Sequence, residues 1–239
     1  MIRLALFISG GGSTACSIIR ACGKNLKKIK PVLVVASKEG NSGIENIKKL
    51  GFPNSDIIVL NPKKYKNINN FADALIFECQ KRKVNLIGQY GWLPLTPKKF
   101  IKVYKDLIIN QHPGPLDNNG IDFGGKGMYG RRVHTAVLYF RRVIGHDFWT
   151  EATSHLVTEE FDRGRVIGRI KIPIAIDDTV ESLQKKVLPK EHKLQIKVLE
   201  KFREGKIKPL TRKKPLINKN ELKILNDSKY IAKILYPNG

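Results

Sequence analysis

Two polar residues, Asn110 and His112, end an apolar run and have the chemistry to activate a carbonyl group. The run Leu107–Ile109 is typical of a buried strand, and side chains alternate faces along a strand, so Asn110 and His112 are expected to point the same way. An amide donor beside an imidazole can hold the oxyanion that forms when an amine attacks a carbonyl, and the imidazole can serve as acid or base. The alternative interpretation is two polar residues that merely end a strand.

Asp162 is the candidate partner that would keep His112 protonated. It lies in the stretch Thr158–Gly164, which follows a predicted strand and ends in a turn. A nearby carboxylate favours the charged form of an imidazole. We therefore expect the turn to carry Asp162 back to His112.

A glycine loop, Ser9–Thr14, separates the first predicted strand from the first predicted helix. Unpaired backbone N–H groups and the positive end of a helix meet at such a point, and glycine lets the backbone approach a phosphate closely. The spacing fits neither the dinucleotide fingerprint nor a Walker loop, so the loop indicates a phosphomonoester site. The alternative is a tight strand-to-helix turn with Ser13 as N-cap.

Short β-branched runs alternate with amphipathic helical segments over the first hundred residues. The predicted strands are Arg3–Ile8, Pro31–Ala36, Asp56–Leu60, Val84–Gly88 and Asp106–Asn110, and the predicted helices are Ser13–Cys22, Gly43–Leu50 and Ile68–Lys81. This alternation predicts an α/β fold, an open and mostly parallel twisted sheet with helices on both faces. Ligands bind at the carboxyl ends of the strands in such sheets, which is where Asn110 and His112 fall.

The second half of the chain is less regular. A glycine-rich stretch, residues 113–130, shows no periodicity and predicts a loop. The elements expected after it are a helix near Val133–Val143, strands Thr153–Thr158 and Arg165–Pro173, a helical stretch Thr179–Gly205 interrupted near Pro189, and a final helix over Glu221–Ile234. We expect one catalytic domain over residues 1–206 and a basic C-terminal extension over residues 207–239, packed on the same domain.

Composition limits the function classes. The 239 residues include 44 Lys+Arg and 21 Asp+Glu, a net charge of +23. Lysines are spread over nearly every segment and do not alternate with aromatic residues, which argues against nucleic-acid binding and favours a solvated basic surface or attraction of small anions. No apolar run approaches the roughly 20 residues of a membrane span, and no signal peptide is evident. Cys16, Cys22 and Cys79 are typical of reduced core thiols in a cytoplasmic protein.

The motifs occur in an order that resembles the folate-dependent formyltransferases, most closely those members that formylate glycinamide ribonucleotide. The segments that carry the resemblance are Ser9–Ser13, Ser37–Gly43, Leu95–Pro97, Asn110–Pro113, His155–Asp162, Ile176–Val180 and Glu191–His192. The resemblance implies transfer of a formyl group from 10-formyltetrahydrofolate to the amine of glycinamide ribonucleotide in purine biosynthesis. The alternatives are another amine acceptor, an amino sugar nucleotide or methionyl-tRNA, or an inactive relative that binds nucleic acid.

The same resemblance implies roles for individual residues. Asn110 and His112 would stabilise the tetrahedral intermediate, with His112 as proton donor and Asp162 raising its pKa. The remaining implied roles are ribonucleotide binding by Gly11, Gly12, Ser13, Thr14 and Glu191, and folate binding by Trp92, Leu93, Pro94, Leu95, Thr158, Glu159, Glu160 and Phe161. His155 is expected to orient or pack. No metal is implied, no membrane or nucleic-acid partner is expected, and the protein would be a monomer or homodimer.

The chain departs from the family after His112. The loop over residues 113–130 is longer and richer in glycine than the family's, and Thr14 stands where an Asn is common. Lys126, Arg131 and Arg132 could make this loop a lid or phosphate contact, or the loop could be a flexible insertion.

Overall fold

The computed structural model describes residues 1–237, which form two compact units. One unit comprises residues 1–110 and 195–207, and the other comprises residues 111–194 and the chain from residue 208 onward. Strand β5 (Ile108–His112) and helix α6 (Val180–Arg203) each run from one unit into the other.

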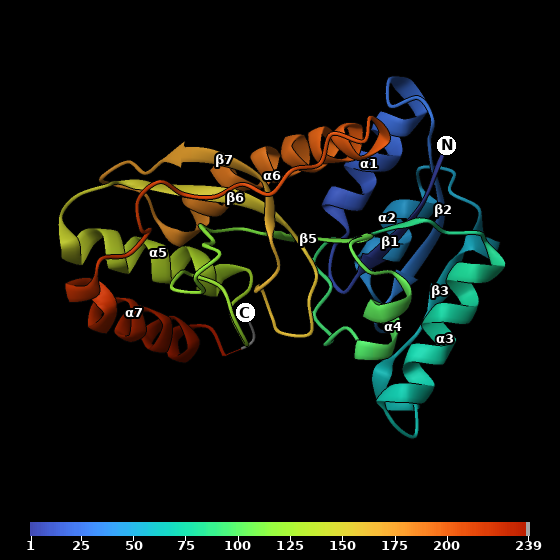
Figure 1. Cartoon of the computed structure of the whole chain (residues 1–239), viewed down its shortest axis with the longest axis horizontal. Helices are drawn as coiled ribbons and strands as arrows, with labels where there is room; N and C mark the ends of the chain where they lie inside the picture. The colour runs from blue at the N-terminus through green and yellow to red at the C-terminus, as the bar shows by residue number, and fades with distance from the viewer. Residues whose placement is uncertain (238–239) are drawn as a thin grey trace. The chain divides into compact units, whose positions relative to one another are not determined.

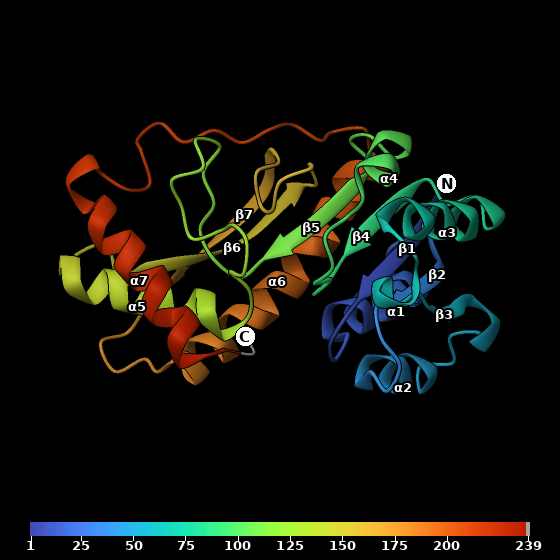
Figure 2. The same cartoon turned by 90° about the horizontal axis from the view of Figure 1, so that it is seen from below.

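The first unit is built from buried strands connected by helices. Its other elements are β1 (Ile2–Ile8), α1 (Ser13–Lys24), β2 (Ile29–Ala36), α2 (Ser42–Lys48), β3 (Ile57–Val59), α3 (Ile68–Lys81), β4 (Leu86–Gln89) and α4 (Lys98–Val103). Residues Leu4–Ile8 of β1 are fully buried, as expected for a strand covered on both faces. Figure 2 shows α2 and α3 on opposite sides of strands β1 to β3.

The strands make one seven-stranded sheet in the order β3-β2-β1-β4-β5-β6-β7. Strands β1 to β5 pair in parallel, with Gln89 of β4 opposite Asn110 of β5. Strands β6 (Trp149–Leu156) and β7 (Val166–Pro173) pair antiparallel. The α/β fold with an open, mostly parallel sheet is therefore confirmed.

The second unit places two helices beside the β6–β7 pair. Helix α5 (Arg131–Ile144) and helix α7 (Leu222–Leu235) pack against each other, and Figure 1 shows α5 with the strand pair on one side and α7 on the other. A short 3-10 helix, Lys219–Glu221, precedes α7. Residues 113–130 form the predicted loop, so all the predicted strands and helices occur, with ends that differ by a few residues.

Two local expectations need correction. Ser13 is the first helical residue of α1 and not its N-cap, because Gly12, with a left-handed φ of 64°, occupies the cap position. All three cysteines are free, but only Cys16 and Cys79 are buried. Cys22 is partly exposed because it lies in the last turn of α1, beyond the buried stripe that ends at Ile18.

No helix within residues 1–237 has both the length and the apolar character that crossing a membrane requires.

The predicted interruption near Pro189 is wrong, since α6 continues through it as one helix of 24 residues. Pro189 lacks the N–H that would bond four residues back, and its ring crowds that carbonyl. The helix persists because Leu183, Val187 and Leu194 are buried along one face at 0%, 0% and 4% exposure.

Replacing this proline should stabilise the fold. Pro189 is exposed, so Pro189→Ala restores a backbone hydrogen bond without disturbing the core. We expect the free energy of unfolding to rise by about 1–3 kcal/mol in urea titration. Lys190→Ala, at the exposed neighbouring position, is the matched control, and an equal effect of both substitutions would show that Pro189 does not strain the helix.

Candidate active site

His112 ends strand β5 as a buried imidazole with one unpartnered nitrogen. Its side chain is 3% exposed, and Nε2 has no hydrogen-bond partner among the described residues. Asn110 lies two positions earlier in the same strand, so strand alternation places both side chains on one face. A buried imidazole nitrogen without a partner is unfavourable on its own, which indicates a position where a ligand completes the hydrogen bond.

Asp162 is carried back to His112 by the turn that follows β6, as predicted. Its Oδ2 lies 3.6 Å from His112 Nδ1, an electrostatic contact longer than a hydrogen bond, and accepts a hydrogen bond of 2.9 Å from the backbone N–H of Gly125. The Asp162 backbone is left-handed, with φ of 56°, a conformation that few residues other than glycine adopt. Strain of this kind persists where the surroundings hold a functional side chain in place.

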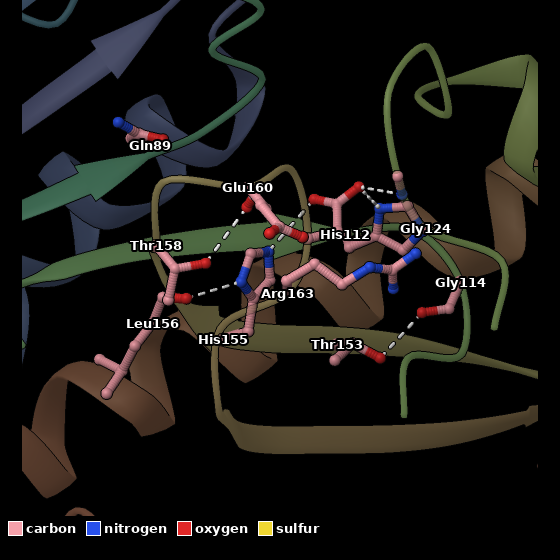
Figure 3. A network of polar contacts seen from close by, with 12 residues as sticks. Gln89, His112, Gly114, Gly124, Thr153, His155, Leu156, Thr158, Glu160 and Arg163 are labelled. Atoms are coloured by element: carbon pink, nitrogen blue, oxygen red, sulfur yellow. Dashed lines mark hydrogen bonds and ion pairs between the residues drawn. The ribbon is translucent and has the colours of Figure 1, made fainter. Parts of the chain in front are cut away.

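His155 contacts the same carboxylate from the other side. Its Nε2 lies 3.4 Å from Asp162 Oδ1, and its Nδ1 lies 2.9 Å from the carbonyl oxygen of Leu156. Figure 3 shows His112 and His155 approaching from two directions, with dashed lines marking these contacts. Both ring nitrogens of His155 therefore face acceptor oxygens.

The electrostatics of the site keep Asp162 ionised. Burial acts to raise the pKa of the Asp162 carboxyl, but His112, His155 and the Gly125 N–H oppose it, and the pKa falls well below its ordinary value. Burial lowers the pKa of His112, and the Asp162 carboxylate acts in the opposite direction. The predicted sign of the Asp162 contribution is therefore correct. The pKa of His112 is nevertheless lowered from its ordinary value, because desolvation is the larger effect.

The loop over residues 113–130 is organised by a buried carboxylate, Asp122. Its oxygens accept hydrogen bonds from the backbone N–H groups of Asp117 and Gly124, at 2.9 and 2.8 Å, and lie 3.2 Å from the Arg163 guanidinium. Asp122 is 0% exposed, so these donors replace the hydrogen bonds that water makes to an exposed carboxylate. This network argues against a flexible insertion.

Two basic residues at the end of the loop are directed toward the C-terminal segment. The Arg132 guanidinium donates to the carbonyl oxygens of Gly127, Tyr236 and Pro237, at 2.8, 2.7 and 2.5 Å. Arg131 lies over the Tyr236 ring, 5.7 Å from its centroid. The possible role of these arginines in binding a phosphate is therefore not supported by their contacts.

In the first unit, the glycine loop brings β1 close to α2. A Cβ on Gly12 would lie 3.2 Å from Gly43 Cα, and Asn46 Nδ2 donates to the Gly11 carbonyl at 3.1 Å. Ser13 is exposed at the start of α1. The hydroxyl of Thr14 is buried with no partner among the described residues. The start of helix α1 and the unpartnered Thr14 hydroxyl are features that fit an anion.

The segment Trp92–Leu95 lies beside this loop in the same unit. The backbone N–H of Leu93 donates to Ser9 Oγ at 3.0 Å. Trp92 is buried, and its ring lies 5.0 Å from that of Phe7, so it packs in an aromatic core. Leu93 and Leu95 are 49% and 47% exposed, which leaves apolar surface available to a flat ring.

The other predicted site residues lie in the second unit. Thr158, Glu159 and Glu160 are in the turn before Asp162, where the Thr158 hydroxyl donates to the Glu160 carbonyl at 3.2 Å; these three side chains are exposed, and Phe161 is half-buried. Glu191 is buried in α6. No group of three or more His, Cys, Asp or Glu side chains within residues 1–237 is arranged to hold a metal ion.

Some residues of the site could not be identified from sequence. The contribution of Gly125 is a backbone N–H, and Asp122 is an isolated acid in an irregular loop. His155 was expected to orient or pack, and its contact with Asp162 agrees with orientation. The sequence signal for this contact is the position of His155 near the end of β6, the strand that leads into the turn carrying Asp162.

Comparison with known proteins identifies relatives of this chain. A formyl transferase family model matches residues 2–199. Phosphoribosylglycinamide formyltransferases named as chloroplastic, from Arabidopsis thaliana and Vigna unguiculata, are each 32% identical over 86% of this chain, which covers 67% and 62% of their lengths. The chain therefore spans about two thirds of these plant relatives.

A solved structure agrees with the sequence match. Phosphoribosylglycinamide formyltransferase from Brucella melitensis is 27% identical and superposes with a TM-score of 0.71, covering 87% of this chain and 99% of that one. The match of the family model over most of the chain, together with the plant relatives, shows that the chain belongs to the formyl transferase family.

Proposed function

We propose that this chain transfers the formyl group of 10-formyltetrahydrofolate to the amine of glycinamide ribonucleotide, a step of purine biosynthesis. The observation that carries the proposal is the buried His112, which faces Asp162 through Nδ1 and leaves Nε2 without a partner among the described residues. The names of the relatives, phosphoribosylglycinamide formyltransferases, support this acceptor.

His112 would move one proton during the reaction. The amine nitrogen attacks the formyl carbon, a C–N bond forms, and the carbonyl π electrons move to oxygen. The low pKa of the buried His112 leaves Nε2 free to take the proton from the attacking nitrogen. When the intermediate collapses, the C=O bond forms again and the bond to the folate nitrogen breaks, and His112 gives its proton to that nitrogen. The products are the formylated ribonucleotide and tetrahydrofolate.

Asn110 and Asp162 would stabilise the charges that this step creates. The Asn110 amide would donate to the oxyanion of the intermediate. Asp162 would stabilise the imidazolium that His112 becomes after accepting the proton, since its carboxylate is ionised and 3.6 Å away. The proposal that His112 later acts as proton donor is thus retained for the second half of the reaction.

The two substrates have candidate sites with suitable chemistry. The glycine loop and the orphaned Thr14 hydroxyl fit the phosphate of the ribonucleotide. The exposed Leu93 and Leu95 side chains and the turn Thr158–Phe161 are the candidate folate contacts. We further propose that the enzyme acts on these small molecules in the cytoplasm, whose reducing conditions suit its free thiols.

Catalytic variants provide the first test. Asp162→Asn preserves shape but removes the charge that stabilises the His112 imidazolium, and Asn110→Ala removes the oxyanion donor. We expect each to lower kcat by about 100-fold or more in a spectrophotometric assay of folate deformylation. Asp227→Asn, an exposed acid on α7, serves as control.

Acceptor competition completes that test. Glycinamide ribonucleotide is compared with an amino sugar nucleotide and with methionyl-tRNA, and only the first should support rapid turnover. Folate deformylation without the ribonucleotide, or wild-type rates in either catalytic variant, would contradict the proposed function.

The phosphate loop is tested by removing its hydroxyls. Ser13→Ala and Thr14→Val keep the helix start but delete donors near the expected phosphate, so the KM of the ribonucleotide should rise roughly 3- to 10-fold, with the folate KM unchanged. Ser17→Ala, one turn further along α1, is the matched control. An equal rise in the KM values of both substrates would refute a phosphate-specific role.

Glu191, a proposed ribonucleotide-binding residue, has a buried carboxyl whose ionisation affects the stability of the fold. Burial raises the pKa of its carboxyl from 4.5 to about 8, so the folded protein keeps it neutral at pH 7. As pH rises from 4.5 toward 8, the unfolded chain loses this proton while the folded one retains it. The contribution of Glu191 to the free energy of unfolding therefore decreases over this range.

Glu191→Gln should remove that pH dependence, because the amide cannot ionise. We expect the stability of the variant relative to wild type to increase by about 1–5 kcal/mol between about pH 5 and pH 8 in urea titrations. Glu200→Gln, on the same helix but partly exposed, is the control. A stability difference that is the same at both pH values would contradict the buried, neutral state of Glu191.

A further inference from the structure

The C-terminal segment, residues 208–237, lies outside the family match, which ends at residue 199, and is anchored along the second unit. The Leu210 N–H donates to the Val166 carbonyl of β7 at 2.7 Å. Arg212 donates to the Leu116 carbonyl at 3.1 Å and forms an ion pair with Glu151. The segment therefore contacts the start of the 113–130 loop before α7 begins.

Lys229 of α7 binds the middle of that loop. Its Nζ donates to the Gly124 carbonyl oxygen at 2.9 Å. This oxygen belongs to the same peptide group as the Gly125 N–H, which donates to Asp162 Oδ2, also at 2.9 Å. One peptide group thus joins an ammonium of the C-terminal helix to the carboxylate that faces His112.

The charge of Lys229 affects the hydrogen bond at the other end of this peptide group. A cation at the carbonyl oxygen withdraws electron density from the peptide, and hydrogen bonds in a chain strengthen one another in a buried environment. Lys229 should therefore make the Gly125 N–H a stronger donor to the Asp162 carboxylate, in addition to fixing the orientation of the peptide.

The glycines and Asp122 make the arrangement specific. A Cβ on Gly124 would lie 2.8 Å from Asp162 Cβ and 2.6 Å from the Leu116 side chain. Any side chain at position 124 would therefore prevent the loop from approaching Asp162 this closely. Gly125 has φ of 107°, which L side chains rarely adopt. The Asp122 carboxylate holds the Gly124 N–H at 2.8 Å, which fixes the other side of the residue.

We propose that the C-terminal segment completes the active site, with Lys229 as a positioning residue that orients the Asp162 carboxylate through the Gly124–Gly125 peptide group. The inference rests on the proposed role of Asp162 in formyl transfer, but the connection itself is a property of the protein without substrates. Lys229 is half-buried on α7, next to the buried Ser228, and Leu225 and Ala232 are also buried on this helix.

Few other charged groups lie near His112, and Lys229 differs from them in its origin. The charged and titratable groups around His112 are Asp162, His155, Asp122, His134 and Lys229. Of these, only Lys229 comes from the C-terminal segment.

The test replaces Lys229 and follows both catalysis and the Gly125 amide. Lys229→Met keeps most of the length of the side chain but loses charge and donor, and we expect kcat to fall roughly 10- to 100-fold, with the KM of each substrate within about twofold of wild type. In NMR spectra without substrates, the Gly125 amide proton should move upfield as its hydrogen bond weakens. Lys229→Arg should restore both the rate and the amide signal.

Control variants distinguish a positioning role of Lys229 from a folding defect, and the outcomes distinguish failure of this inference from failure of the proposed reaction. Lys223→Met removes an exposed lysine of the same helix and should change neither readout. If Lys229→Met does not fold, Lys229→Gln is measured against Lys229→Arg under the same criteria. An unchanged Gly125 amide, or a wild-type kcat in the Met or Gln variant, overturns the inference. An absence of formyl transfer in the wild-type protein overturns the proposed function alone, since the amide readout needs no substrate.

Discussion

The ionised carboxylate of Asp162 is the feature on which the rest of the site depends. A buried negative charge is stable only if donors and positive charge compensate it. Here the Gly125 N–H donates to Asp162 Oδ2, and the imidazoles of His112 and His155 each face one oxygen of the carboxylate. The carboxylate in turn affects His112, because it acts to raise the pKa of the imidazole while burial lowers it.

The surroundings of this carboxylate come from segments far apart in the chain. Strand β5 supplies His112, strand β6 supplies His155, and the loop after β5 supplies the Gly125 amide. That loop is held from within by Asp122 and from outside by Lys229, 105 residues beyond Gly124. An irregular loop can thus position a buried carboxylate where hydrogen bonds, rather than secondary structure, define the shape of the loop.

The sequence predicted the parts of the structure that obey local rules. Strand periodicity placed Asn110 and His112 at the end of β5, and the turn after β6 brought Asp162 to His112. It failed where distant packing decides, since α6 continues through Pro189 and desolvation outweighs Asp162 at His112. Nothing in the pattern around Lys229 indicates a carbonyl partner in another segment, so its contact with Gly124 required the structure.

The central claim is that the Asp162 charge raises the pKa of His112 in opposition to burial, and an NMR titration of the His112 ring measures this directly. With His112 ring signals assigned, the pKa is compared between the wild-type protein and Asp162→Asn. Loss of the carboxylate should lower the pKa of His112 further, because the effect of desolvation is then no longer opposed by the negative charge. A pKa that is unchanged or higher in Asp162→Asn would contradict the account.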